Sequence, residues 1–480
     1  MSMYSTTTEA RRRRLRLLVI AGLLAAGVAG FTGGCWWMEH RYPMLKEPAF
    51  ANLDRTYKEI MSDYLDGATG VDLIHGAAEG MTDSLGDPYS VYYTGEEGIS
   101  YVQRYEDHIV GIGVEIREED GEFVINSAIK GAPAEKAGLL KDDVIIAIDG
   151  REMKGRTMTD LIKLTRGEEG TKVRLTISRS GLAEPFEVSL TRANVPVRTV
   201  TSELLEDGIG VVQISRFAEK TDVEFNEAVD RLLEQGMKGL LIDLRMNPGG
   251  LVNPTIEIAN RLIPKDKVIL QVVYKNERKE ITYRSEQKKP WTLPIVVLID
   301  EGSASSSEVL AAALRDSAGA KLIGVKSFGK GIVQTFQQFK DGSVLKLTAS
   351  QWRTPSGNWI HEQGIAPDQE VKMPEYARLP ALPTDEVQKA GSYGQSVQTA
   401  EQMLEALGYS TGKAEGIYDE RTASAVTRFQ EAERISPTGT ITARTAFRLM
   451  ERLREKIQSD DPQMREGLQA LREELAGPVR

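Results

Sequence analysis

Residues 295–308 read IVVLIDEGSASSSE, an apolar run followed by an acidic turn and a series of small side chains. The apolar run is typical of a buried strand, and the residues after it predict a helix from Ser305 to Leu314. Ser305 with Glu308 three residues later fits a helix capping box, which is a purely structural interpretation. A serine at a strand-to-helix corner is also where a nucleophile stands beside helix N–H groups that stabilise an oxyanion.

Strands and helices alternate on both sides of this stretch, between about residues 191 and 371. Such alternation predicts an α/β layer with a substantially parallel sheet, whose active groups normally lie at the carboxyl ends of its strands. We expect strands at 210–214, 239–244, 268–273, 295–299 and 321–325, and helices at 221–235, 253–262 and 305–314.

Two further loops carry unusual residues. The segment 243–250, DLRMNPGG, follows an apolar strand, and its paired glycines leave backbone N–H groups free to face a ligand, although a simple turn is the common alternative. The segment 324–331 has the glycine and lysine spacing of a phosphate-binding loop. Gly331, however, stands where that motif has the serine or threonine whose hydroxyl holds magnesium, which argues against a nucleotide site. Lys330 and Gln334 are four apart, which places both side chains on one side of a helix or a strand.

Together these motifs resemble those of the carboxy-terminal processing proteases, serine peptidases of the tail-specific type. The resemblance implies Ser305 as nucleophile, Lys330 as general base and Gln334 as the group that orients the lysine. It implies an oxyanion hole of backbone N–H groups at Ser306, Gly249 and Gly250, and it implies no metal and no cofactor. The matching segments are GSASSSE at 302–308, FGKGIVQ at 328–334, DLRMNPGG at 243–250, GIAPD at 364–368 and TDSLGDPYS at 82–90; Ser306 stands where many relatives have alanine.

The implied lysine base sets a physical requirement. A free lysine has a pKa near 10.4, so a lysine that accepts a proton near neutral pH needs a pKa about 3 lower. Burial has this effect because it destabilises the ammonium. An amide at Gln334 adds no charge, whereas a carboxylate there would raise the pKa of the lysine.

A strand-like period precedes the peptidase segment. The pieces GIGV at 111–114, GAPAEKAGL at 131–139 and DDVIIAIDG at 142–150 resemble a PDZ domain. The resemblance implies that Gly111, Ile112, Gly113 and Val114 bind the terminal carboxylate of a peptide while a strand edge pairs with it; a small β domain that binds nothing is the alternative. Arg166, at the edge of this domain, is a candidate switch that reports peptide occupancy, or else a solvated surface arginine.

The C-terminal part predicts a small helical unit. Val397 to Met450 resembles the peptidoglycan-binding three-helix module, with an inert bundle or a dimerisation element as the alternatives. The proline-spaced stretch 374–383 is predicted to be a linker. The charged segment 452–475 is predicted to be helical and to extend from the module or lie over the core.

The N-terminal residues indicate export. Five arginines precede an apolar run from Leu17, and 22 uncharged residues up to Met38 just span a bilayer at ~1.5 Å per residue. We expect an uncleaved single-pass anchor, with a cleaved signal peptide as the alternative; Cys35 lacks the leucine expected before a lipidated cysteine. A helical pair follows, and it is too short to bury a core alone, so we expect it to pack on a neighbour or on a second copy of itself. The resemblance to the proteases implies a homodimer formed through these helices and the C-terminal region.

Composition excludes several classes of function. A formal net charge of -10 argues against a general nucleic-acid binder. One cysteine excludes an intramolecular disulfide, and none of the 4 histidines has the spacing of a helical metal site.

The predicted fold is therefore multidomain α/β and α+β. Its parts are an anchor (1–38), a helical region (45–96), a PDZ domain (97–190), an α/β serine peptidase core (191–380), a C-terminal helical bundle (385–455) and a charged tail (456–480).

The predicted function is an extracytoplasmic serine endopeptidase of the cell envelope that recognises the C-terminal ends of protein substrates, binds peptidoglycan and acts, by analogy, in a pathway such as sporulation signalling. A catalytically silent PDZ and wall-binding scaffold is the alternative.

Overall fold

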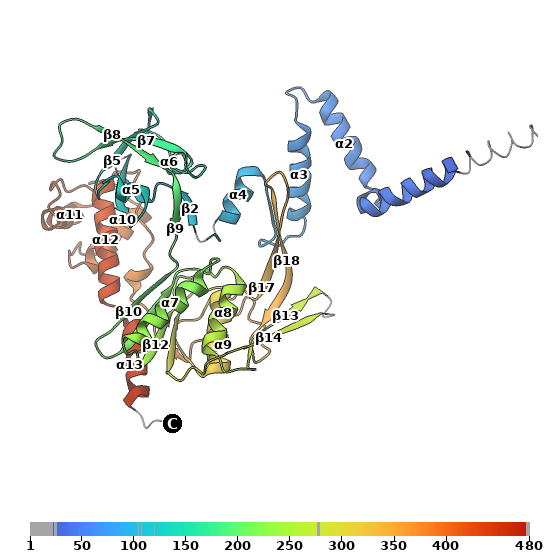
Figure 1. The fold of residues 1–480 in the computed structure, drawn as a ribbon. Helices are drawn as coiled ribbons and strands as arrows, with labels where there is room; N and C mark the ends of the chain where they lie inside the picture. The colour runs from blue at the N-terminus through green and yellow to red at the C-terminus, as the bar shows by residue number, and fades with distance from the viewer. Residues whose placement is uncertain are drawn as a thin grey trace, which may run out of the picture. The chain divides into compact units, whose positions relative to one another are not determined.

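The computed structural model describes residue 23 and residues 26–103, 105–106, 108–119, 121–275 and 279–476. The chain forms two compact units, Met1–Thr94 and Gly95–Arg480. Figure 1 shows the first unit in blue, and the second runs from light blue through green and yellow to red.

The first unit is mainly helical, as the sequence predicts. Thr69 caps α3 by accepting a hydrogen bond from the Asp72 N–H at 3.1 Å. Across the described residues, no helix has both the length and the apolar character needed to span a bilayer. Residues 1–22, 24 and 25 of the predicted anchor (1–38) lie outside them. The elements are a helix over 26–41, η1 (Pro43–Lys46), α2 (Phe50–Asp63), α3 (Gly70–Asp83) and β1 (Val91–Tyr93).

The second unit begins with a β domain over the segment predicted to be a PDZ domain. Its strands follow the order β3-β4-β5-β7-β8, and β2 pairs separately with β9. The strand predicted from Val110 to Ile116 is in fact two strands, because Gly113 has a φ of 74° and breaks the extended run. The elements are α4 (Gly95–Gln103), β2 (His108–Gly111), β3 (Val114–Glu119), β4 (Glu122–Ala128), α5 (Pro133–Lys136), β5 (Val144–Ile148), β6 (Arg151–Glu152), α6 (Met158–Thr165), β7 (Lys172–Ser178), β8 (Phe186–Thr191) and β9 (Ala193–Pro196).

The predicted α/β layer follows in the chain. Its sheet has the order β10-β11-β12-β15-β16-β19, parallel except for the β10–β11 pair. The elements are β10 (Val200–Leu204), β11 (Ile209–Ile214), α7 (Thr221–Glu234), β12 (Gly239–Asp243), α8 (Val252–Leu262), β15 (Ile295–Ile299), α9 (Ser306–Ala318), β16 (Lys321–Gly324) and β19 (Gln369–Glu370).

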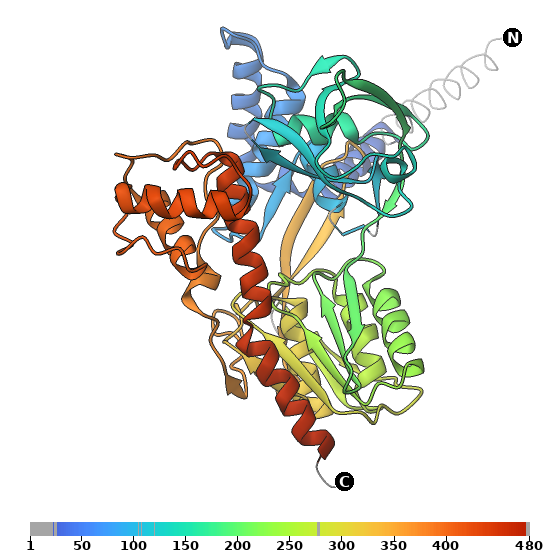
Figure 2. The ribbon, with the colours of Figure 1, turned by 90° about the vertical axis from the view of Figure 1, so that its left-hand side faces the viewer.

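Both faces of this sheet are covered, which explains why its strands are apolar at every position. Leu240 and Ile242 of β12 belong to the core cluster formed with α7, α8 and α9. Leu241, which points to the opposite face, packs with Leu471 of α13 (Pro462–Ala476). Figure 2 shows this C-terminal red helix running along the sheet. The charged segment 452–475 therefore does lie over the core in part.

An antiparallel sheet stands beside this layer and carries the lysine predicted to be catalytic next to its first strand. Its order is β17-β18-β13-β14. The strands are β13 (Val268–Tyr274), β14 (Glu280–Arg284), β17 (Ile332–Gln338) and β18 (Val344–Arg353).

The C-terminal helices form a separate small core. The stretch 374–383 is not the linker that its prolines predict: it contains the 3₁₀ helix η3 (Glu375–Arg378), and Leu382 is 3% exposed within the core of this module. The chain turns at Asp460, where α12 ends, so residues 452–475 form parts of two helices. The module comprises α10 (Gln395–Ala406), α11 (Glu420–Ala432) and α12 (Ala443–Ser459).

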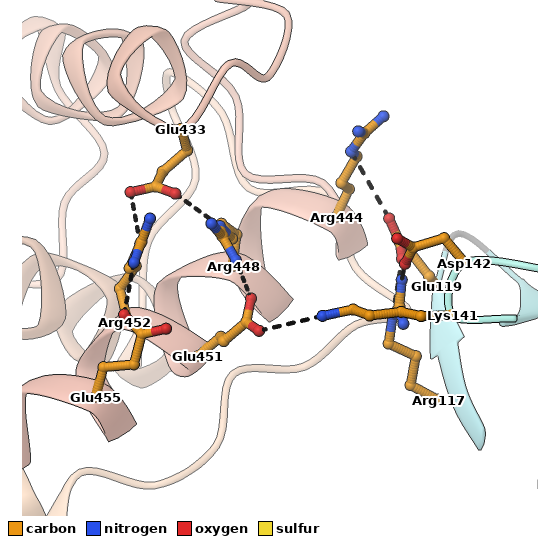
Figure 3. A network of polar contacts seen from close by, with 10 residues as sticks. All are labelled: Arg117, Glu119, Lys141, Asp142, Glu433, Arg444, Arg448, Glu451, Arg452 and Glu455. Carbon is orange, nitrogen blue, oxygen red and sulfur yellow. Dashed lines mark hydrogen bonds and ion pairs between the residues drawn. The ribbon is translucent and has the colours of Figure 1, made fainter. Parts of the chain in front are cut away.

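This module contacts the β domain through charged side chains. Glu451 of α12 lies 4.0 Å from Lys141, and Arg444 lies 3.8 Å from Glu119 of β3. Arg117 stacks over the ring of Phe447 at 5.0 Å from its centroid. Figure 3 shows the ion pairs joining α12 to the loop and strand of the β domain.

Candidate active site

Ser305 lies at the corner between β15 and α9, as the sequence predicts. Its backbone has φ 54° and ψ −114°, a conformation that costs energy for a residue with a side chain. The N–H of Ser305 donates to the Glu308 carboxylate at 2.8 Å, which is the half of the predicted capping box that fixes the turn. The corner is thus held in a strained geometry at the N-terminus of a buried helix.

A cavity of about 330 Å³ brings Ser305, Lys330 and Gln334 together, and Gly250 also lines it. Lys330 comes from the loop before β17 and Gln334 from within that strand, whereas Ser305 follows β15 of the parallel sheet. Apolar side chains dominate the rest of the lining, among them Leu251, Val252, Leu270, Val272, Val309, Ile332, Val333 and Trp352.

The side-chain amide nitrogen of Gln334, Nε2, is buried and has no hydrogen-bond partner among the residues that the structure describes. The pairing of β17 with β18 shifts register between Val333 and Gln334, a bulge that re-aims the side chain. A buried amide without a bond is costly, so this group is ready to bond to Lys330 or to a bound substrate.

The loop after β12 passes close to Ser305 and Ser306. A Cβ placed on Gly249 would lie 2.9 Å from the Ser306 nitrogen, which shows how closely the two backbones approach. The Gly249 N–H already donates to Asn247 Oδ1 at 2.9 Å. Within the described part of the chain, the N–H groups of Gly250 and Ser306 donate to no acceptor. Of the predicted oxyanion donors, these two therefore remain open.

Asn247 organises this loop, and sequence reasoning did not assign it a role. Its side chain is fully buried and donates to the Ile214 carbonyl at 2.8 Å. Its own carbonyl accepts from the Ala304 N–H at 3.0 Å and from the Ser307 hydroxyl at 2.9 Å. Asn247 thus connects the glycine loop to the turn at Ser305, and its position in the unusual 243–250 segment was the only sequence indication.

Asp300 holds the first half of the same turn. Its Oδ1 accepts from the Met246 N–H at 2.8 Å and from the Gly302 N–H at 2.9 Å. Burial raises the pKa of Asp300 above its ordinary value, and these N–H donors only partly offset that effect.

The β domain has a second cavity, of about 320 Å³, that contains the predicted peptide-binding loop. Gly111, Ile112, Gly113 and Val114 line it together with Arg166, which follows α6 directly. A Cβ on Gly113 would lie 2.2 Å from the Ala132 Cβ, so only glycine fits this turn. The structure therefore places Arg166 at the groove rather than on a distant surface.

Family models match four parts of the chain. The models are Peptidase family S41 at residues 208–371, the PDZ domain at 124–179, the peptidoglycan binding domain at 393–449 and the activating protease CtpB N-terminal domain at 39–97. These matches confirm the predicted resemblances to a PDZ domain and to a peptidoglycan-binding module.

Curated relatives match over nearly the whole chain. Carboxy-terminal processing protease CtpA of Bacillus subtilis (strain 168) is 40% identical over 468 residues, which cover 97% of this chain and 100% of the relative. A CtpA-like serine protease of Staphylococcus aureus (strain MRSA252) is 36% identical over 411 residues, 85% of this chain and 82% of the relative. Among solved structures, the photosystem II D1 C-terminal processing protease is 28% identical with a TM-score of 0.41, and the match covers 69% of this chain and 88% of that one.

Proposed function

The chain belongs to the carboxy-terminal processing proteases, serine peptidases of family S41, and we propose that it hydrolyses protein substrates outside the cytoplasm with Ser305 as nucleophile and Lys330 as general base. The observation that supports these roles best is the shared cavity of Ser305, Lys330 and Gln334. No histidine lines that cavity among the described residues, so the lysine is its basic side chain.

The proposed chemistry follows the steps of acyl transfer. Lys330 Nζ takes the proton of the Ser305 hydroxyl as Oγ attacks the peptide carbonyl carbon. The oxygen of the tetrahedral intermediate carries the negative charge and accepts hydrogen bonds from the Gly250 and Ser306 N–H groups. Lys330 then gives its proton to the leaving amine, and an acyl-enzyme forms.

Water completes the cycle. Lys330 accepts a proton from water, the resulting hydroxide attacks the acyl carbon, and the proton returns to Ser305 Oγ as the new carboxylate leaves. Most of the residues that line the cavity are apolar, and we propose that this lining favours the neutral amine that this step needs. Gln334 orients that amine without adding a charge.

Substrate selection is assigned to the PDZ domain. We propose that the loop from Gly111 to Val114 binds the C-terminal carboxylate of an unfolded substrate and that Arg166 reports its presence to the core. The proposed switch is tested by measuring cleavage with and without a stimulating C-terminal peptide. Arg166→Ala should abolish the stimulation, with the exposed Arg156→Ala as the matched control; unchanged stimulation in Arg166→Ala would remove the switch role.

The cellular setting is also a proposal. We place the chain in the cell envelope, anchored through its N-terminal segment or secreted after cleavage, bound to peptidoglycan and assembled as a homodimer, with sporulation signalling as one pathway by analogy. Cell fractionation with N-terminal mass spectrometry distinguishes an anchored chain from a cleaved or lipidated one. Sedimentation with purified peptidoglycan tests wall binding, and light scattering of the purified chain tests the dimer.

The catalytic proposal is tested by incubating the full-length chain with an unfolded protein, in parallel with Ser305→Ala and Lys330→Ala. Only the unmutated chain should produce fragments. If it produces none even with a PDZ-binding peptide present, a silent scaffold explains the chain better. Equal cleavage by all three chains would show that other residues perform the chemistry.

A further inference from the structure

Glu308 is a fully buried carboxylate one helical turn after the nucleophile. Isolated charges are almost never buried so completely unless hydrogen bonds compensate them. Four hydrogen-bond donors surround the carboxylate of Glu308. Oε1 accepts from the Ser327 hydroxyl at 2.6 Å and the Gly329 N–H at 2.7 Å. Oε2 accepts from the Ser305 N–H and the Lys330 N–H, each at 2.8 Å.

These contacts go beyond the capping of a helix. Of these four bonds, only the one from the Ser305 N–H belongs to a capping box. The other three donors belong to the loop that carries the proposed base, far along the chain from α9. One oxygen, Oε2, is shared by the backbone nitrogens of Ser305 and Lys330, so their separation cannot exceed the sum of the two bond lengths.

The opposite side of the lysine loop is fixed independently. The carbonyl of Lys330 accepts a hydrogen bond from the indole N–H of Trp352 at 2.8 Å, and Trp352 is 1% exposed. The loop is therefore clamped between a tryptophan on its carbonyl side and Glu308 on its N–H side. Charge-assisted bonds such as those to Glu308 are about twice as strong as neutral ones.

We propose that Glu308 is a positioning residue that sets the distance between nucleophile and base; this inference rests on the proposed roles of Ser305 and Lys330. Glu308 acts through the backbone of both residues and does not touch the substrate. A carboxylate is required because all four neighbours are donors, whereas a glutamine would turn its amide N–H₂ toward two of them.

Kinetics of the full-length chain on an unfolded protein substrate test this role. Glu308→Gln should lower kcat by about 100-fold, the effect of a misplacement near 1 Å, and leave KM within about threefold. Glu301→Gln is the matched control, since Glu301 lies in the turn before α9 and its side chain is 55% exposed, and its kcat should be unchanged. Circular dichroism and thermal unfolding show whether each variant is folded.

A second variant keeps the inference testable if Glu308→Gln does not fold. Ser327→Ala removes one of the four donors and should lower kcat by about 10-fold with KM unchanged. Full kcat in a folded Glu308→Gln, or in Ser327→Ala, would overturn the positioning role. A loss that appears in KM alone would also overturn it. Failure of the unmutated chain to cleave would instead contradict the proposed function.

Discussion

The Cα of Gly249 lies against Ser305: a Cβ built on Gly249 would be 2.9 Å from the Ser305 Cβ and 2.6 Å from the Ala304 carbonyl oxygen. Gly249 also has a φ of 95°, in the region that favours glycine. The glycine loop and the turn at Ser305 therefore fit together only if residue 249 has no side chain. Gly250, the next residue, lines the same cavity as Ser305.

Gly249→Ala should consequently separate the loop from the turn and lower kcat by about 100-fold. Gly236→Ala is the matched control, because Gly236 has the same φ of 95° but open space around its Cα. Both variants carry the same backbone strain, so both should lose some thermal stability. Loss of activity in both, or in neither, would contradict the role assigned to this contact.

The C-terminal helix α13 should contribute directly to the stability of the peptidase core. Leu471 is fully buried against the sheet, whereas Leu475 on the same helix is 37% exposed. Leu471→Ala should lower the free energy of unfolding by about 2–5 kcal/mol because it leaves a cavity, and Leu475→Ala should cost clearly less. Denaturant unfolding followed by the signal of the peptidase core measures both. Equal small effects would mean that α13 is peripheral.

The network in Figure 3 predicts a pH-dependent stability for the C-terminal module. Burial raises the pKa of Glu433, but hydrogen bonds from Arg452 and Arg448 outweigh it and hold the pKa below its ordinary value of 4.5. Because the pKa of Glu433 is lower in the folded state than its ordinary value, the ionised carboxylate stabilises the folded module at pH values above that ordinary value. This stabilisation is lost as the pH falls through the lowered pKa.

Glu433→Gln should therefore destabilise the module by about 2 kcal/mol at neutral pH and by much less near pH 3. Glu455→Gln is the control, because Glu455 pairs with Arg452 but its side chain is 53% exposed. Thermal unfolding of the three chains at both pH values gives the comparison. A Glu433→Gln deficit that is the same at both pH values would show that the ion pairs do not cause it.

Much of the fold could be predicted because local patterns and the tertiary structure agree. The run IVVLI at 295–299 forms β15, and the predicted segments Gly239–Leu244 and Lys321–Val325 largely become β12 and β16. Proline spacing was misleading at 374–383, because Leu382 packs into the module core despite the prolines around it. The periodicity of apolar residues predicts which face of a helix is buried, but it does not identify the element that packs against that face. The position of α13 on the sheet therefore could not be predicted.

The candidate site was predictable where side-chain chemistry is distinctive. Ser305, Lys330 and Gln334 were chosen by their residue types and motifs, and the structure places them in one cavity. The Gly249 N–H was not separable from that of Gly250 by sequence, because its bond to Asn247 depends on the folded loop. The contacts of Glu308 with the lysine loop are likewise long-range, and a capping pattern does not indicate them.

The most direct measurement of the central claim is covalent labelling of the full-length chain with a serine-directed fluorophosphonate, located by peptide mass spectrometry. We expect a single modified peptide carrying the label on Ser305, formed rapidly by the unmutated chain and at least about 100-fold more slowly by Lys330→Ala. A label on another serine, or equal labelling rates in the two chains, would contradict a Ser305 nucleophile activated by Lys330.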